Sequence, residues 1–209
     1  KIFTENHPLY ANTLYNLGSC YFFMGDYAKA EVNYQQSLAI KKAILGRNHP
    51  EYANSLNNLA VLYSKIGNYE QVNKLFAEAL SIKEDFSGSN SADYALVLNN
   101  IASMHHHNKE YDKALELFNQ VLEIQKNNLG TEHPEYITTL NNVATLYNNT
   151  QQYDKAKEIY EQVLKIREQV LGINHPAYAF TLSLLGTLYL STGDYTKAEH
   201  YLIQCLELR

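Results

Sequence analysis

The 209-residue sequence has no tryptophan, only two cysteines and no cluster of basic residues. Apart from Lys41-Lys42 its lysines occur singly, and its formal net charge is −5, which argues against binding to a nucleic-acid backbone, since that requires clustered lysine and arginine. No apolar run approaches the roughly 18 residues that indicate a membrane span, and the N-terminus lacks a signal-peptide pattern. Because Cys20 and Cys205 lie near opposite ends of the chain, we expect two buried thiols in a reducing, cytoplasmic compartment and no intramolecular disulfide.

The sequence also lacks the motifs that carry common enzymatic chemistry. It contains no phosphate-binding loop, glycine-rich dinucleotide turn, zinc-protease helix or nucleophile elbow. The run His105-His106-His107 suggests a metal site, but consecutive helical residues point about 100° apart, so the three side chains cannot face one ion. His106 and Glu110 are four residues apart and would suit a weak site, although solvated side chains are the favoured interpretation. We expect no enzymatic activity, no cofactor and no bound metal.

What the sequence does contain is a motif that returns every 42 residues. Its prolines are Pro8, Pro50, Pro134 and Pro176, and Ala92 fills the one missing slot. Its tyrosines fall in two main phases: Tyr10, Tyr52, Tyr94, Tyr136 and Tyr178, then Tyr27, Tyr69, Tyr111, Tyr153 and Tyr195. A fixed period in this range is typical of a solenoid, in which each unit packs mainly on its neighbours. We expect most tyrosine rings to be buried between helices, with their hydroxyls at a polar rim.

Each unit predicts two helices joined by a tight turn. In residues 8–49, the first apolar stripe consists of Tyr10, Leu14, Leu17 and Tyr21, and the second consists of Tyr27, Ala30, Tyr34 and Leu38. Pro8 suits the first helical turn, Gly25 ends the first helix, Asp26 caps the second and Gly46 ends it. Histidines precede the prolines, at His7, His49, His133 and His175. Their regularity argues for a helix cap or an inter-repeat hydrogen bond.

The pattern Leu17-Gly18, Tyr21, Ala30, Tyr34 resembles the tetratricopeptide repeat, with Leu14 in place of the usual tryptophan. The 42-residue length, with LNNLAVLY at 56–63 and LGTEHP at 129–134, is similar to the extended repeats of kinesin light chains. The resemblance implies an all-α, right-handed α-solenoid of five antiparallel helix pairs. It also implies one domain over residues 1–209, with repeats at about 8–49, 50–91, 92–133, 134–175 and 176–209. Residues 1–7 align with the tail of a preceding unit, and Arg209 stops before its helix would finish, so we expect a fragment of a longer array or an end covered by another domain or chain.

In this family the first helices of the repeats line a concave groove. The most regular groove positions here are asparagines, whose amides donate and accept together and so suit the backbone of an extended peptide. The groove residues implied are Asn16, Asn54, Asn57, Asn58, Asn99, Asn100, Asn141 and Asn142, together with Lys65. The alternative is that the asparagines bond to one another between repeats. Paired cations that clamp a terminal carboxylate are missing from the corresponding slots, which argues against acidic C-terminal tails as partners.

Apolar residues gather at the two ends of the implied groove and suggest anchor pockets for partner side chains. They are Tyr15, Phe22 and Phe23 at one end, and Phe180, Leu184 and Leu190 at the other. The alternative is that Phe22 and Leu190 belong to the core. The sequence therefore predicts a protein-interaction scaffold that binds a peptide or protein in its groove. The alternative is a spacer or regulatory arm that self-associates through its ends and serves a catalytic or signalling domain outside this chain.

Overall fold

The computed structural model describes residues 7–208, and over this range all regular structure is α-helical. The helices are α1 (Pro8–Phe23), α2 (Tyr27–Leu45), α3 (Pro50–Ile66), α4 (Tyr69–Ser87), α5 (Ala92–His107), α6 (Tyr111–Leu129), α7 (Pro134–Asn149), α8 (Tyr153–Leu171), α9 (Pro176–Thr192) and α10 (Tyr195–Glu207). The predicted all-α solenoid of helix pairs is confirmed, and each pair starts and turns at the positions that the 42-residue period marks. The predictions about residues 1–6 and Arg209 lie outside the described range.

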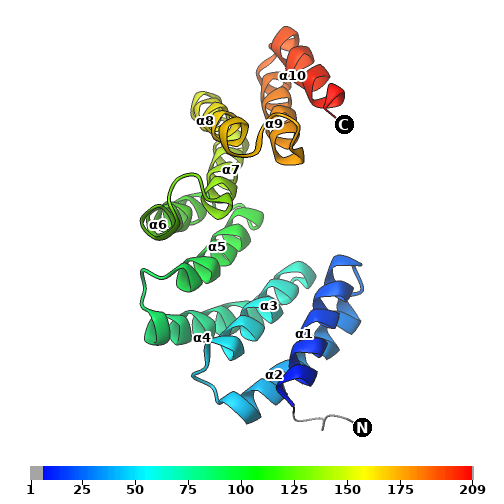
Figure 1. Ribbon diagram of the computed structural model, residues 1–209, viewed down its shortest axis with the longest axis vertical. Coiled ribbons are helices and arrows are strands. Elements are labelled where there is room, and N and C mark those ends of the chain that lie inside the picture. Colours follow the sequence, from blue (N-terminus) through cyan, green and yellow to red (C-terminus); the bar gives the residue numbers. More distant parts are fainter. Residues whose placement is uncertain (1–6, 209) are drawn as a thin grey trace. The chain divides into compact units, whose positions relative to one another are not determined.

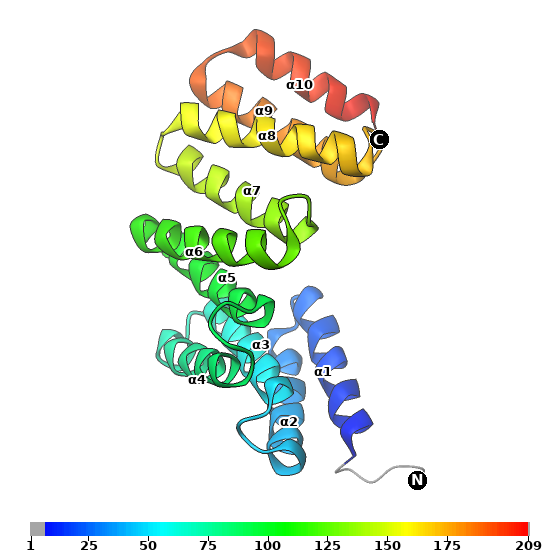
Figure 2. The same ribbon diagram turned by 60° about the vertical axis from the view of Figure 1, so that its left-hand side comes forward.

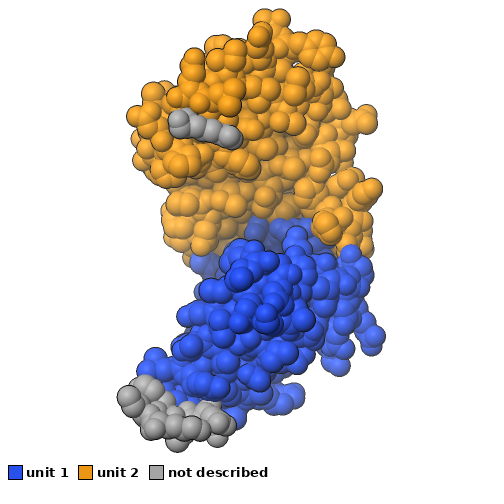
Figure 3. Space-filling view, turned by 90° about the vertical axis from the view of Figure 1, so that its right-hand side faces the viewer, with its two compact units in different colours: residues 1–104 blue, residues 105–209 orange. Residues whose placement is uncertain are grey.

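The chain forms two compact units, unit 1 with residues 1–104 and unit 2 with residues 105–209 (Figure 3). Within unit 1, helices α1 to α4 each pack against the next one along the chain, and within unit 2 the same holds for α6 to α10 (Figures 1 and 2). The assignment of the whole chain to a single domain stays a prediction. None of the helices between residues 7 and 208 is both long and apolar enough to cross a membrane.

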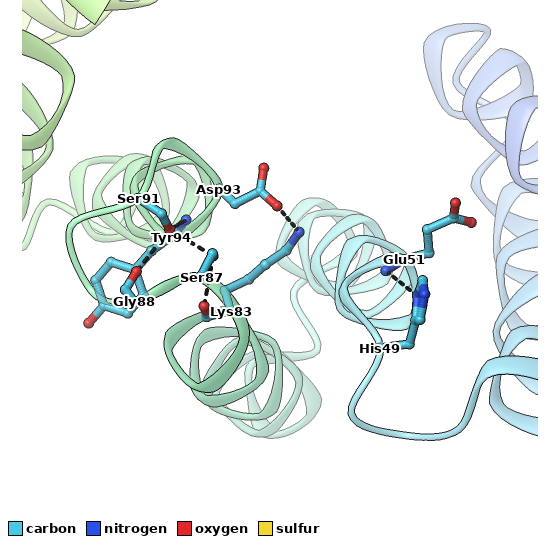
Figure 4. A network of polar contacts seen from close by, with 8 residues as sticks. All are labelled: His49, Glu51, Lys83, Ser87, Gly88, Ser91, Asp93 and Tyr94. Atoms are coloured by element: carbon cyan, nitrogen blue, oxygen red, sulfur yellow. Dashed lines mark hydrogen bonds and ion pairs between the residues drawn. The ribbon is translucent and has the colours of Figure 1, made fainter. Parts of the chain in front are cut away.

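The histidines before the prolines cap the first helices, as one of the two sequence interpretations predicted. In α1, α3, α7 and α9 the ring nitrogen Nδ1 of the capping histidine accepts a hydrogen bond from the backbone N–H two residues later. For His49 the distance to the nitrogen of Glu51 is 3.1 Å (Figure 4). The third repeat has Ser91 in this slot, and its hydroxyl accepts from the N–H of Tyr94 at 3.2 Å instead. An accepting side chain at this position satisfies one of the unpaired N–H groups at a helix start.

The turns between paired helices require a residue with positive φ. Gly67 (φ 79°) supplies it in the second repeat, and glycine adopts this conformation without a Cβ penalty. In the third and fourth repeats the same position holds Lys109 (φ 62°) and Gln151 (φ 60°). A left-handed conformation costs such residues roughly 1 kcal/mol each. The geometry of the turn is therefore kept even where the favourable residue has been lost.

Small residues in the first helices allow close helix packing. A Cβ atom on Gly18 would lie 2.7 Å from Cδ1 of the buried Tyr34 ring, and one on Gly186 would lie 2.6 Å from Cγ of Leu202. The core of unit 1 is built around Tyr34, Leu56 and Phe76, all buried. In unit 2, buried Tyr160 and Leu185 occupy a similar cluster.

Two expectations about burial are wrong. Tyr34, Tyr52, Tyr136 and Tyr160 are buried as expected, but in the second-helix phase Tyr69 is 44% exposed and Tyr195 is 71% exposed, because this phase lies at the first residue of each second helix. Both cysteines are free, and Cys205 is buried, but Cys20 is exposed. Its counterparts Leu62 and Leu146 are buried inside their units.

Candidate functional site

The predicted groove asparagines lie on the first helices, but their exposure differs from one to the next. Asn57 and Asn141 are buried, with 5% and 6% of their surfaces exposed. Those of intermediate exposure are Asn54, Asn58, Asn99, Asn100 and Asn142, whereas Asn16 and Lys65 are exposed. The predicted groove residues therefore include both buried side chains and side chains exposed to solvent.

In unit 1 three of these asparagines form a chain of hydrogen bonds that links α1, α3 and α5. Asn58 donates from Nδ2 to the hydroxyl of Tyr15 at 2.6 Å. Asn57 donates to Oδ1 of Asn58 at 3.3 Å, and Asn100 donates to Oδ1 of Asn57 at 3.0 Å. Much of the hydrogen-bonding capacity of Asn57 and Asn58 is therefore used inside unit 1, which is the alternative that the sequence left open.

The asparagine side-chain bonds that join one first helix to the next share a spacing of 43 residues. Asn58 and Tyr15 are 43 apart, as are Asn100 and Asn57. In unit 2 the Nδ2 group of Asn149 lies 2.8 Å from Nε2 of His106, again 43 residues away. A side chain that donates to the residue 43 positions earlier thus recurs in both units.

One carbonyl in unit 2 lacks such a donor. Oδ1 of Asn141 is buried and has no hydrogen-bond partner among residues 7–208. The residue 43 positions after Asn141 is Leu184, which occupies the slot of Asn100 and has no group to donate. Leaving a buried polar atom unpaired costs about 1–3 kcal/mol. The substitution at Leu184 explains why the series of amide bonds is incomplete in unit 2.

The predicted apolar anchors are partly exposed. In unit 1, Tyr15 and Phe22 are half-buried and Phe23 is 86% exposed, with the rings of Phe22 and Phe23 packed edge to face at 5.7 Å between centroids. In unit 2, Phe180 and Leu190 are exposed and Leu184 is half-buried against the core. The alternative that Phe22 and Leu190 are core residues does not apply to Leu190, which is 47% exposed.

A pocket of about 170 Å³ lies in unit 1, where helices α1, α2, α3 and α5 contribute side chains. Its lining consists of Ser19, Phe22, Phe23, Tyr34, Asn58, Val61 and Asn100. Four of these are predicted site residues, from both the asparagine set and the apolar set, whereas Lys65 is not part of the lining. No charged side chain lines this pocket in the described part of the chain. The structure thus brings predicted anchors and predicted amides together at one place.

A second series of residues was missed by the sequence analysis. Lys41, Lys83, Gln125 and Arg167 follow the 42-residue period on the second helices, and all four are buried, Lys83 with only 1% exposed. Lysine and arginine are rarely buried unless paired. The available signal was the period itself, together with an acidic residue ten positions after each lysine, Glu51 and Asp93.

These buried cations contact the start of the next first helix. Nζ of Lys83 lies 2.7 Å from Oδ2 of Asp93 (Figure 4). Nζ of Lys41 lies 3.6 Å from Oε2 of Glu51 and 4.7 Å from the centre of the Tyr15 ring. Burial lowers the pKa of Lys41, and the Glu51 carboxylate opposes that shift.

Arg167 binds differently, because Ala177 stands where earlier repeats have an acidic residue. Its Nη1 donates to the carbonyl of Ala177 at 2.7 Å and to the hydroxyl of Thr181 at 2.6 Å. Burial lowers the pKa of Arg167. Three members of the series therefore join a second helix to the following first helix, Lys41 and Lys83 by ion pairs and Arg167 by bonds to neutral acceptors.

The histidine run does not form a metal site in the structure. Residues 7–208 contain no group of three or more His, Cys, Asp or Glu side chains close enough to hold a metal ion. Glu110 contacts His105 at 3.0 Å and Lys113 at 2.7 Å rather than His106, whose pairing with Glu110 was the less favoured interpretation of the sequence. The pKa of His106 is lowered, mainly by burial and also by neighbouring His107.

Comparison with known proteins gives a consistent result. The family model described as Tetratricopeptide repeat matches residues 9–85, 93–169 and 137–209. A solved structure described as a putative kinesin light chain with nearly identical TPR-like repeats, from Podosopora anserina, is 25% identical, with a TM-score of 0.77 and coverage of 97% of this chain and 96% of that chain. BtubC (BKLC) from P. vanneervenii is 24% identical over 97% of this chain and 80% of its own, with a TM-score of 0.80. MamA is 20% identical over 95% and 91%, with a TM-score of 0.54. A search of curated proteins found no match.

Proposed function

The chain belongs to the tetratricopeptide repeat family, whose repeats generally mediate protein–protein interaction, and we propose that it binds a segment of a partner protein along its first helices. The observation that carries this proposal is the pocket in unit 1. Exposed Phe23 and half-buried Phe22 lie there beside the amides of Asn58 and Asn100. Aromatic side chains are enriched at protein-binding surfaces and supply much of their affinity, which supports this assignment.

The charge of the candidate surface favours an uncharged partner segment. Among the predicted groove residues only Lys65 carries a charge, and it is exposed. A surface without clustered cations has little attraction for a phosphate backbone or for an acidic tail. We therefore favour a protein segment with apolar and polar residues over nucleic acid or an acidic terminus. The cytoplasmic location inferred from the sequence stays a prediction.

The test is selection of binders from a display library of random peptides, followed by mapping of the bound surface. Enriched peptides are titrated into isotope-labelled protein, and the shifted NMR signals are assigned to first or second helices. We expect the largest shifts at Asn54, Asn99 and Asn100 on the first helices. Peptides whose shifts lie on the second helices, or a library from which nothing is enriched, would contradict the proposal.

A second candidate, self-association, is favoured by the exposure of α1. Leu17 is 41% exposed, whereas its counterpart Leu59 is 4% exposed within unit 1. An exposed position that is buried in other repeats suits contact with another helix. Light scattering over a concentration series tests this candidate, because a mass that stays monomeric at all concentrations eliminates it.

A further inference from the structure

We propose that the unit 1 pocket binds one uncharged apolar side chain of a partner, with the backbone N–H of that partner residue donating to Oδ1 of Asn100. This inference rests on the proposed function and specifies the chemistry of the partner. The asparagine amides by themselves suit the backbone of an extended peptide. The pocket adds a place where a side chain is selected.

The walls of the pocket are apolar and already accessible. Phe23 is the most exposed large apolar residue of the described chain, and Phe22 packs both on it and on Tyr27, with ring centroids 5.7 and 5.8 Å away. Val61 supplies an aliphatic wall from α3. Covering such surface with an apolar group is worth roughly 25 cal/mol per Å². The walls therefore favour an aromatic or aliphatic side chain.

The volume suits one such side chain. The pocket encloses about 170 Å³. A protein cavity of about 150 Å³ with apolar walls holds one benzene molecule. One phenylalanine or leucine side chain is therefore the expected occupant, whereas two large side chains would not fit.

The hydroxyls of the pocket are already paired and do not require a polar occupant. The hydroxyl of Tyr34 donates to Ser19 at 3.1 Å, and the Ser19 hydroxyl donates to the carbonyl of Tyr15 at 3.2 Å. No charged side chain is present among the described lining residues to compensate a bound charge. Because an unpaired charge loses its hydration on burial, lysine, arginine, aspartate and glutamate side chains are excluded.

Asn100 provides the remaining polar contact. Its Nδ2 donates to Asn57, but across residues 7–208 its Oδ1 receives no hydrogen bond. Asn58 differs, because its Oδ1 accepts from Asn57 and its Nδ2 donates to Tyr15. Asn100 therefore presents an acceptor to an occupant of the pocket, and the backbone N–H is the donor that every residue except proline carries beside its side chain.

The corresponding positions in unit 2 are different. The counterparts of Phe22 and Phe23 in the fourth repeat are Asn148 and Asn149, and the Asn149 amide is bonded to His106. The same shift of 126 residues places Leu184 at the position of Asn58. Unit 2 therefore supplies matched control positions that lack the proposed chemistry.

The experiment is an NMR titration of the full chain with N-acetyl-phenylalaninamide, a single residue flanked by two peptide groups. We expect saturable shifts of the Val61 methyl signals and the Asn100 side-chain amide signals. N-acetyl-leucinamide should bind similarly, and the lysine and aspartate analogues about tenfold more weakly or not at all. The probe that is N-methylated on the phenylalanine nitrogen lacks the backbone N–H of that residue and should bind about fivefold more weakly, because one hydrogen bond is lost.

Two variants complete the design. Phe23→Ala removes an exposed wall without disturbing the core and should weaken the phenylalanine probe several-fold. Phe180→Ala removes an exposed phenylalanine from unit 2 and should leave the affinity unchanged. The proposed binding at the pocket would be contradicted if charged and apolar probes bound equally well. NMR shifts centred away from Val61, or binding that does not saturate, would also contradict it. Equal binding of the N-methylated probe would overturn the role of Asn100.

The experiments can contradict the proposed pocket and the proposed function independently of each other. If selected peptides map to the first helices but the single-residue probe does not bind, the pocket is wrong and the proposed function stands. If the probe saturates the pocket but selected peptides map to the second helices, the proposed function is wrong while the pocket remains a site for small apolar groups.

Discussion

In unit 1 the side-chain amides of the first helices form a connected series of hydrogen bonds, whereas in unit 2 the series is interrupted at Asn141. Asn57 accepts a hydrogen bond from Asn100, while its counterpart Asn141 has a buried Oδ1 without a partner in the described chain. The difference comes from one position, because Leu184 stands where unit 1 has Asn100. Two units with the same period therefore differ in how their polar groups are satisfied.

The buried slot of the second helices shows a similar contrast. In unit 1 it holds Lys41 and Lys83, each beside a carboxylate. In unit 2 it holds Gln125, whose Oε1 is buried without a partner among residues 7–208, and Arg167, which binds neutral groups. Unit 1 therefore pairs its buried cations with carboxylates, whereas in unit 2 the same slot has one unpaired amide oxygen and one cation that binds only neutral groups.

The largest expected effect is that of Lys83→Ala, which we expect to cost about 3 kcal/mol in the free energy of unfolding. The change leaves a cavity where a fully buried side chain lay and removes the partner of Asp93. Lys83→Met, which keeps most of the volume, should cost about 1 kcal/mol. Urea denaturation followed by helical circular dichroism measures both changes.

Gln125→Met is the matched control in unit 2. It keeps the volume and removes an oxygen that has no partner, so we expect no loss of stability. If Lys83→Ala loses no more unfolding free energy than Lys83→Met, the packing of the lysine side chain contributes little to stability.

A smaller effect is expected from restoring the donor in unit 2. Leu184→Asn places an amide where Asn100 lies in unit 1, and it should be about 1 kcal/mol more stable than Leu184→Ala. The alanine variant is the reference because both changes lose the packing of Leu184 against the core. Equal urea midpoints for the two variants would mean that the new amide does not reach Asn141.

The smallest effect concerns pH and the bond between Asn149 and His106. The folded protein lowers the pKa of His106, so the neutral ring is favoured by folding, and this contribution is present above the ordinary histidine pKa and lost as the pH falls below it. Donation from Asn149 to Nε2 also requires the neutral ring. We expect the urea midpoint to fall less between about pH 7 and about pH 5 in His106→Gln than in the unsubstituted protein. The same pH dependence in both would contradict this assignment.

Much of the fold could be predicted from the sequence because it depends on local rules. Pro8 and Pro50 begin helices, Gly46 ends one, and the histidine caps act two residues along the chain. The pairing of helices followed from the spacing of apolar residues. The candidate site was predicted only as a set of positions, and which of them meet in one pocket was not.

The sequence by itself determined the period, the helix bounds and the repeat family, since these rest on neighbouring residues and on copied spacing. Only the tertiary structure decided that Asn57 and Asn58 bond within unit 1, that Asn100 keeps an open acceptor, and that Lys83 is buried against Asp93. The physical reason is that each of these outcomes depends on a residue in another helix. Asn100 donates a hydrogen bond to a residue 43 positions earlier, whereas Leu184 has no group to donate to the residue 43 positions before it. Residues this far apart in the sequence come into contact only because successive helix pairs pack together.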